Sequence, residues 1–328
     1  MKRLLLVLSA LMLATFAFAQ RQITISFVET SDVHGNYLPY DFINGRPGEG
    51  GLARVCTYVE KLRNKQGKDH VVLLDNGDIL QGQPTAYYYD YIDTTSTHLC
   101  AEVLNFMHYD PGTVGNHDVE TGHAVYDRWV SQCRYPVLGA NVIDVRSGKP
   151  YWKPYTILKR QGVRIAVLGM ITPCIPMWLP QNLWENLRFD DQEAIARQYM
   201  PEMQRQADVI VGLFHSGVGN DTVTTPCAEH AAVAVARRVP GFDVVFCGHD
   251  HREAHRLVQN VAGKEVLVLN PAANAHVVAQ ADVTLTLKGK KVIDKKVQGR
   301  VVSVLNEQPH AGFMQHFAKQ YEAVRQFT

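Results

Sequence analysis

The chain has 328 residues, of which 46% are hydrophobic and 20% charged, and its formal net charge is +1. This near-neutral balance excludes the strongly basic class of nucleic-acid binders, so no polymeric nucleic acid is expected as a partner. The length fits one large domain or two small ones and is sufficient to bury a substantial core.

The first 19 residues have the features of a secretory signal peptide. Lys2 and Arg3 form a short basic start, an apolar run extends from Leu4 to Phe18, and Ala17-Phe18-Ala19 is a small-x-small ending. The apolar run has about 15 residues, fewer than the roughly 20 that a membrane-spanning helix needs. We therefore expect a signal peptide over 1–19, cleavage after Ala19, and a periplasmic or extracellular protein without stable membrane insertion.

Apolar segments of β type alternate with segments of helical spacing along the following part of the chain. The β-type runs lie at 23–28, 71–74, 136–138, 163–170, 209–214, 244–247 and 266–269. Apolar residues recur at helical spacing over 51–64, 191–206 and 228–238. Strands that alternate with helices predict an α/β fold.

The last third of the chain has a different pattern. Residues 281–302 alternate apolar and polar side chains around the turn Lys288-Gly289-Lys290, which predicts an antiparallel hairpin. Residues 309–328 are predicted to form one terminal helix with Phe313, Phe317 and Tyr321 on one face. No linker is evident, so we expect a single domain over 20–308 followed by this helix.

The six cysteines are Cys56, Cys100, Cys133, Cys174, Cys227 and Cys247. Export permits disulfides, but six cysteines allow 15 pairings, and the sequence does not choose among them. None has CxxC spacing, which argues against a thiolate zinc site. Cys247 lies in an apolar run, as is typical of a buried free thiol.

Residues of metal-ligand type follow five of the apolar segments. The motifs are Asp32-Val33-His34, Gly77-Asp78, Gly115-Asn116-His117-Asp118, His215-Ser216-Gly217 and Gly248-His249-Asp250-His251. Ligands bind beyond the carboxyl ends of strands in open α/β sheets, so we expect the five motifs to converge. The i, i+2 spacing within Asp-x-His and His-x-His is expected to place both side chains on one strand face.

The chemistry of these side chains suits two divalent metal ions. Carboxylates and neutral imidazoles bind Mn²⁺, Zn²⁺, Fe or Co²⁺, and a two-metal hydrolase needs about four such ligands per ion. Eight further histidines are expected to be solvated and to bind no metal: His70, His98, His108, His123, His230, His255, His310 and His316. The role of His276 is left open.

The ordered motifs resemble the metallophosphoesterase superfamily, also called calcineurin-like phosphoesterases, throughout residues 32–251. Within this superfamily the chain most resembles the bacterial 5′-nucleotidase group. Residues 75–82 and 140–144 favour one branch of that group, the 2′,3′-cyclic-nucleotide 2′-phosphodiesterase/3′-nucleotidases. Leu80 and Gln81 differ from the Asp and Arg that protein phosphatases of the superfamily carry there. The resemblance implies a four-layer α/β/β/α sandwich of two mixed sheets.

The resemblance also implies which motif residues bind metal. The first ion would be bound by Asp32, His34 and His251, the second by Asn116, His215 and His249, and Asp78 would bridge the two. A metal-bound water or hydroxide would attack phosphorus in line and hydrolyse nucleotide phosphate esters.

Three further roles follow from the same resemblance. Asn116 and His117 would contact the substrate. His117 would stabilise the phosphoryl oxygens or protonate the leaving oxygen. A carboxylate would orient His117, and both Glu120 and Asp118 are candidates.

The chain departs from the family pattern in two places. The family's Gly-x-Trp-Gly segment is replaced by Ala272-Ala273-Asn274-Ala275, which is followed by His276. Full-length relatives also carry a C-terminal domain whose aromatic residues stack on the nucleoside base, whereas this chain ends at Thr328. A separately encoded domain of that type is an expected partner, docking on the aromatic face of the 309–328 helix; alternatively, that face packs on the domain's own core.

Three functional classes are therefore considered. The first is a nucleotide-directed hydrolase, and the second is a broad-specificity phosphomonoesterase or diesterase acting on other substrates. The third is a non-enzymatic metal-binding or interaction protein on the same fold, against which the complete set of motif residues argues.

Overall fold

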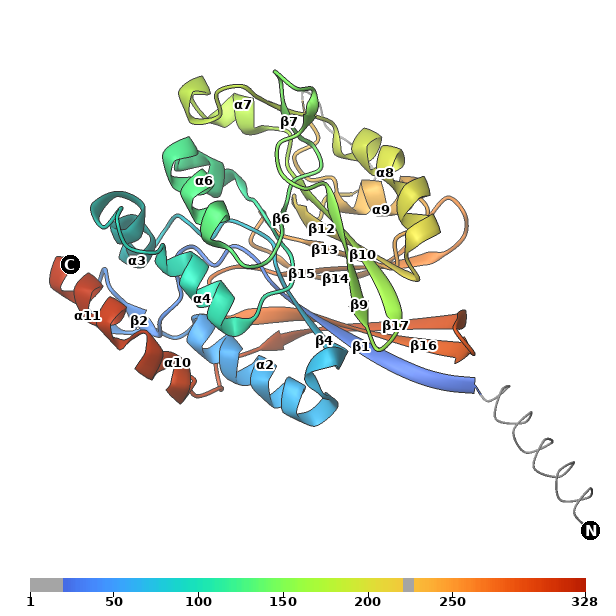
Figure 1. The fold of residues 1–328 in the computed structure, drawn as a ribbon, viewed down its shortest axis with the longest axis horizontal. Coiled ribbons are helices and arrows are strands. Elements are labelled where there is room, and N and C mark those ends of the chain that lie inside the picture. Colours follow the sequence, from blue (N-terminus) through green and yellow to red (C-terminus); the bar gives the residue numbers. More distant parts are fainter. Residues whose placement is uncertain (1–19, 221–226) are drawn as a thin grey trace, which may run out of the picture.

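A computed structural model describes residues 20–220 and 227–328, and its centre consists of two six-stranded mixed sheets packed face to face (Figure 1). The predicted signal peptide over 1–19 lies outside the described residues.

The first sheet has the strand order β17-β16-β1-β4-β5-β6. Its strands are β1 (Gln20–Thr30), β4 (Val71–Asp75), β5 (Gly112–Thr113), β6 (Val137–Leu138), β16 (Val277–Lys288) and β17 (Lys291–Ser303). In this sheet β1, β4, β5 and β6 are parallel, whereas β16 runs antiparallel to β1 and to β17. The carboxyl ends of the parallel strands therefore lie at one edge, and the predicted hairpin is confirmed as β16 and β17.

The second sheet has the order β14-β15-β13-β12-β10-β9. Its strands are β9 (Tyr155–Arg160), β10 (Val163–Ile171), β12 (Val209–His215), β13 (Val244–Cys247), β14 (Glu253–Gln259) and β15 (Glu265–Pro271). The four inner strands are parallel, and the two outer strands are antiparallel to their neighbours.

Side-chain alternation along the strands produces the layers. In β4, Val72 and Leu74 face the second sheet, while Val71 and Leu73 face the helices. Such strands are buried on both faces, which explains their unbroken apolar runs.

Helices cover the outer face of each sheet. The first sheet is covered by α2 (Leu52–Gln66), α4 (Leu99–Met107) and α6 (His123–Gln132), and the second by α8 (Gln192–Gln206) and α9 (Ala232–Arg238). The terminal helices α10 (Ala311–His316) and α11 (Ala318–Phe327) pack on the helices of the first group. Figure 1 shows the two groups of helices on opposite sides of the strands. The predicted α/β/β/α sandwich is confirmed.

Shorter elements complete the chain between these layers. They are β2 (Tyr40–Asp41), β3 (Arg46–Pro47), η1 (Lys68–His70), α3 (Pro84–Tyr87), the π-helix η2 (Tyr88–Ile92), α5 (Asn116–Glu120), β7 (Val142–Asp144), β8 (Lys149–Pro150), α7 (Ile175–Trp178), η3 (Gln181–Leu183) and β11 (Leu187–Phe189). Cys174 and Cys227 form a disulfide, and Cys247 is a buried free thiol, as predicted.

The terminal segment forms two helices rather than the single helix predicted. Phe317 separates them with φ −97° and ψ 15°. Phe313 and Phe317 are fully buried, and their rings lie 5.7 and 5.5 Å from that of Phe106 in α4. Tyr321 packs edge-on against Tyr40 at 5.4 Å.

The expectation that this aromatic face docks a partner domain is therefore wrong for Phe313 and Phe317. Burying a phenylalanine side chain contributes roughly 1.5–3 kcal/mol, which favours packing on the chain's own core. The structure supports the alternative, in which this face packs on the domain itself.

His98 is another residue whose environment differs from the prediction. Its side chain is fully buried, not solvated, and its Nε2 lies 2.8 Å from Oδ1 of Asp90 in η2. The backbone N–H of Cys100 donates to His98 Nδ1 at the start of α4. Burial raises the pKa of Asp90 to about 8 and lowers the pKa of His98 to about 3.

This pair predicts how stability depends on pH. The folded chain holds the Asp90 proton up to about pH 8, whereas the unfolded chain releases it near pH 3.8, so this group destabilises the fold as pH rises. His98 acts in the opposite sense, but only below its ordinary pKa of 6.5. Between pH 6.5 and 8 the free energy of unfolding should therefore fall, by about 1–2 kcal/mol.

Urea unfolding at pH 6.5 and 8 checks this prediction. Asp90→Asn, whose amide oxygen still accepts from His98, should lose this part of the pH dependence. Asp294→Asn, at an exposed position, is the matched control and should keep it. Equal slopes for Asp90→Asn and the unmodified chain would contradict the assignment.

Candidate metal centre

The polar motifs meet where parallel strands of both sheets end. Asp32 follows β1, Asp78 follows β4, and Asn116 begins α5 just after β5. His215 is the last residue of β12, and His249 lies two residues beyond β13. The convergence expected at the carboxyl edge is therefore present.

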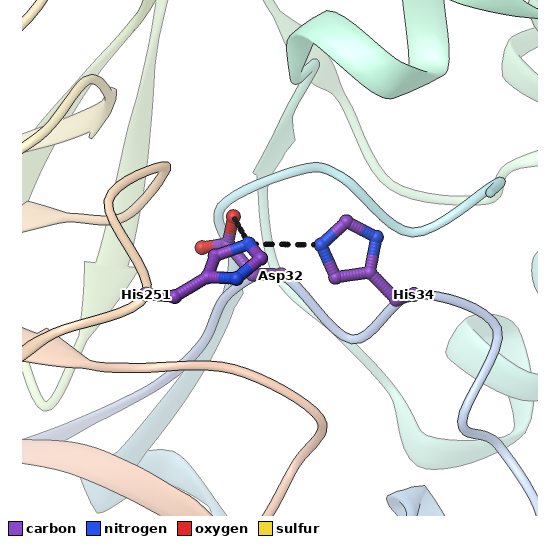
Figure 2. A group of neighbouring side chains, drawn as sticks. All are labelled: Asp32, His34 and His251. Atoms are coloured by element: carbon purple, nitrogen blue, oxygen red, sulfur yellow. Dashed lines mark hydrogen bonds and ion pairs between the residues drawn. The ribbon is translucent and has the colours of Figure 1, made fainter. Parts of the chain in front are cut away.

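The first cluster consists of Asp32, His34 and His251 (Figure 2). The Nε2 atoms of His34 and His251 lie 3.0 Å apart, and Nε2 of His251 lies 3.3 Å from Oδ1 of Asp32. Nδ1 of His34 faces the carbonyl oxygen of Gln81 at 3.1 Å, to which a protonated Nδ1 donates. With Nδ1 protonated, the Nε2 lone pair of His34 is directed at the cluster. A hydrogen bond from the other ring nitrogen commonly orients a metal-binding histidine in this way.

The second cluster consists of Asp78, His215 and His249, together with Asn116. Nε2 of His215 lies 3.1 Å from both Oδ2 of Asp78 and Oδ1 of Asn116. Nδ1 of His249 lies 2.8 Å from the same Asn116 oxygen. Nδ1 of His215 faces the carbonyl oxygen of Asn76 at 2.6 Å, so its Nε2 also points into the cluster.

The electrostatics of the clusters fit divalent cations. Burial alone would raise the pKa of Asp78, but His215, His117 and His34 overcome it and hold the pKa well below its ordinary value. Burial lowers the pKa of His34 and of His249, so both favour the neutral form that binds metal. An ionised carboxylate among neutral imidazoles is a donor set for Mn²⁺, Zn²⁺, Fe or Co²⁺.

For two other histidines, His215 and His251, the surrounding carboxylates instead raise the pKa and so favour the protonated imidazole. Although burial lowers it, Asp78 and Asp32 raise the pKa of His215 to about 10. The hydrogen bond to Asp32 raises the pKa of His251. The carboxylates thus attract positive charge to both clusters.

Five of the predicted metal ligands have left-handed backbone conformations. Their φ angles are 51° at Asp32, 51° at His34, 52° at Asp78, 71° at His249 and 53° at His251. Such conformations strain a non-glycine residue and concentrate at functional sites. The prediction that strand alternation aligns the Asp-x-His and His-x-His pairs is wrong, because both pairs lie in turns beyond their strands.

Glycines allow the turns to approach one another closely. A Cβ atom at Gly115 would overlap the carboxylate of Asp78, and one at Gly248 would overlap Ser31 and Asp32. Any side chain at either position would therefore displace a predicted ligand.

His117 lies beside both clusters and is paired with Glu120. Its backbone N–H donates to Oδ1 of Asp78 at 2.7 Å, and its ring centroid lies 5.5 Å from that of His34. Nδ1 of His117 lies 2.5 Å from Oε2 of Glu120, three residues later in α5. The contact leaves Nε2 as the ring nitrogen available to a substrate.

Asp118, the other carboxylate considered for orienting His117, makes its contacts elsewhere. Its fully buried carboxylate accepts backbone N–H groups from Asp78, Ile79, Leu80 and Gly115, at 2.8–2.9 Å. It therefore fixes the turn that carries Asp78, and the geometry favours Glu120 as the residue that orients His117.

Two residues near His249 have no sequence motif. Oε1 of Glu229 lies 3.0 Å from Nε2 of His249, and the ring of Trp178 stacks on that of His249 at 5.5 Å with an interplanar angle of 23°. The Cys174–Cys227 disulfide joins the segments that precede Trp178 and Glu229. His230, assigned above to a solvated position, is exposed but also borders this group.

The segment that replaces Gly-x-Trp-Gly supports the first cluster through its backbone. The N–H of Asn274 donates to the carbonyl oxygen of Asp32 at 2.8 Å, and the Asn36 side chain donates to the carbonyl oxygen of Asn274 at 3.0 Å. His276 lies against Gly50 and is in neither cluster.

Comparison with known proteins agrees with this geometry. The family model described as calcineurin-like phosphoesterase matches residues 25–253. The chain is 31% identical over 259 residues to a 2′,3′-cyclic-nucleotide 2′-phosphodiesterase/3′-nucleotidase of Yersinia enterocolitica, covering 75% of this chain and 39% of that protein. It is 27% identical over 241 residues to a 5′-nucleotidase of Vibrio cholerae, covering 70% and 41%.

Solved structures give the same result. The calcineurin-like phosphoesterase YfkN from Bacillus subtilis superposes with a TM-score of 0.80 at 26% identity, covering 94% of this chain and 99% of that one. The chain thus matches a solved phosphoesterase over nearly its whole length, but it spans only 39% and 41% of the two curated relatives. Within the described ranges 20–220 and 227–328, no helix has the length and apolarity needed to cross a membrane.

Proposed function

The chain belongs to the calcineurin-like phosphoesterase family, and from this membership we propose that it hydrolyses nucleotide phosphate esters with two divalent metal ions. The observation that carries the proposal is the pair of adjacent clusters, in which Asp78 of the second cluster also acts on His34 of the first and the His117 side chain lies beside them. The relatives' names supply the substrate class, which comprises 2′,3′-cyclic nucleotides, 3′-nucleotides and 5′-nucleotides.

The two clusters divide the proposed ligands. Asp32, His34 and His251 would hold one ion, Asn116, His215 and His249 would hold the other, and the Asp78 carboxylate would be a ligand to both. Bound to these residues, two divalent ions would supply the Lewis-acid chemistry that in-line hydrolysis of a phosphate ester needs. Mn²⁺, Zn²⁺, Fe and Co²⁺ all suit these ligands.

The remaining groups act on the substrate directly. The side-chain oxygen Oδ1 of Asn116 faces His215 and His249, so the side-chain NH₂ group remains as a donor to a phosphoryl oxygen. Glu120 holds the Nδ1 proton of His117, so Nε2 is placed to deliver or hold a proton at the leaving oxygen.

The proposal includes an exported protein. Residues 1–19 form the signal peptide, 20–308 the catalytic domain and 309–328 a helical extension that packs on it. The Cys174–Cys227 disulfide supports export, because disulfides persist in oxidising compartments.

A second candidate is a catalytic unit whose nucleotide recognition depends on a separately encoded domain. The observation that favours it is that this chain covers only 39% and 41% of the lengths of the two curated relatives. A broad-specificity phosphoesterase acting on non-nucleotide substrates is the other alternative.

The purified chain should be stripped with a chelator, resupplied with Mn²⁺, and assayed on 2′,3′-cyclic AMP, 3′-AMP, 5′-AMP and bis-p-nitrophenyl phosphate. The proposal expects metal-dependent turnover that favours the nucleotides. Turnover of the artificial diester alone would favour one of the two alternatives. Absence of turnover on all four substrates would contradict the proposal.

Glu229 gives a separate prediction, because it receives the Nε2 hydrogen of His249 and leaves Nδ1 for the second ion. Glu229→Ala should weaken binding of one of the two ions by about 10–100-fold, the usual loss when such a supporting carboxylate is removed. Calorimetric Mn²⁺ titration of the stripped chain measures it. Glu253→Ala, at an exposed position on β14, is the control, and equal affinities for Glu229→Ala and the control would contradict this role.

A further inference from the structure

A cavity of about 500 Å³ opens beside the metal centre. His117 and Glu120 line it, together with the aromatic side chains of Tyr87, Tyr91 and Trp178. This volume falls within the range of small-molecule sites. The cavity lies outside the two metal clusters but shares His117 with the proposed catalytic machinery.

The aromatic side chains of the cavity are unusually exposed for their size. Tyr87 is 52% exposed, Tyr91 48% and Trp178 40%. Large aromatic rings left open within one concave surface commonly mark a binding site. Tyr87 and Tyr91 come from the junction of α3 with the π-helix η2, and their ring centroids lie 5.2 Å apart. π-helical turns of this kind are frequent at functional sites.

Two contacts connect the cavity to the metal clusters. The Trp178 ring stacks on His249 of the second cluster at 5.5 Å, and the His117 ring lies 5.5 Å from His34 of the first. A phosphate ester held at the clusters would therefore have the rest of the molecule within reach of Trp178 and His117.

We infer that this cavity is a nucleoside subsite, in which the base of the substrate stacks on Trp178 beside Tyr91 while the phosphate lies at the metal centre. The inference rests on the proposed function and adds to it that this chain binds the base itself. Base–aromatic stacking tolerates any base, so the subsite should accept nucleotides broadly.

The charges around the cavity fit a neutral aromatic group better than a second anion. Among the described residues that line it there is no lysine or arginine, while Gln81 and Thr121 offer an amide and a hydroxyl to base or sugar. Burial raises the pKa of Asp90, another lining residue, to about 8, so this carboxyl is mostly neutral at pH 7. The phosphate of an anionic substrate would therefore bind at the metal centre, and its uncharged part would bind in the cavity.

Binding of adenosine to the metal-free chain tests the subsite without phosphate, metal or turnover. Isothermal titration should show binding that Trp178→Ala weakens roughly 10–100-fold, as expected when one stacking platform is removed. Trp178→Phe should retain most of the affinity. Met177→Ala is the matched control, since Met177 is 57% exposed on the same helix but does not line the cavity. No adenosine binding, or equal binding by Trp178→Ala and the control, would overturn the inference.

A kinetic comparison separates base recognition from an indirect effect on His249. For Trp178→Ala, kcat/KM should fall about tenfold or more for 3′-AMP relative to ribose 3-phosphate, which has no base. Equal losses on both substrates would mean that Trp178 acts only through His249, and would overturn the subsite. Failure of the proposed function is a different result, in which the unmodified chain with Mn²⁺ hydrolyses neither substrate.

Discussion

Asp78→Asn is expected to lower Mn²⁺-dependent hydrolysis of nucleotides by roughly 10³-fold or more, because the substitution removes the charge shared by both proposed metal positions. The Asp78 carboxylate is fully buried, accepts the His117 N–H through Oδ1, and contacts His215 through Oδ2. Asparagine retains the shape and the acceptor for the His117 N–H, so the fold should persist while divalent ions are bound weakly. Initial rates with 2′,3′-cyclic AMP and 3′-AMP measure the loss.

Metal content and folding must be followed in the same variant. Elemental analysis after dialysis against Mn²⁺ should show fewer than two ions per chain for Asp78→Asn, with an unchanged circular dichroism spectrum. Asp294→Asn, at an exposed position on β17, controls for the loss of one carboxylate. Turnover near that of the unmodified chain with a full complement of metal would refute the bridging role of Asp78.

His117→Ala should lower kcat for nucleotides by about 10²–10⁴-fold, the usual contribution of a positioned general acid, while both ions remain bound. The ring of His117 is in neither metal cluster, and its Nδ1 is held by Glu120, so removing it spares the ligands. Steady-state kinetics together with metal analysis distinguish this loss from a loss of metal.

The choice of leaving group separates the two roles considered for His117. Because p-nitrophenolate needs no proton to depart, the loss on bis-p-nitrophenyl phosphate should be much smaller than on 3′-AMP if His117 protonates the leaving oxygen. Equal losses would assign it instead to stabilisation of the phosphoryl oxygens. Full turnover of His117→Ala on nucleotides would eliminate both roles.

The layered fold and the clusters are predictable because both follow from local order along the chain. β4 has the unbroken apolar sequence Val71–Leu74 and is followed at once by the Asp75–Asp78 turn, so the strand and the end that carries a ligand are adjacent in sequence. Parallel pairing then brings such ends to a common edge without further information. The same logic holds for His215, the last residue of β12.

Residues that reach the site from loops could not be found in this way. Glu229 and Trp178 lie far apart in the sequence and follow no common motif, yet the Cys174–Cys227 disulfide brings their segments to His249. The pairing itself was undetermined among the possible cysteine pairs. A single sequence carries no periodicity that reports such long-range contacts.

Buried polar pairs were missed for a related reason. His98 stands in a polar stretch and has no apolar neighbour before it, so it resembles a solvated histidine until its contact with Asp90 is known. The left-handed backbone of Asp32, His34 and His251 was likewise invisible, because tertiary contacts impose it on residues that ordinarily avoid it.

Titration of the metal-stripped chain with Mn²⁺, with bound ions and 3′-AMP hydrolysis followed in the same samples, tests the central claim most directly. The proposed dinuclear centre predicts that two ions bind per chain and that activity develops as the second position fills. Full activity with one bound ion, or no hydrolysis when two are bound, would contradict it.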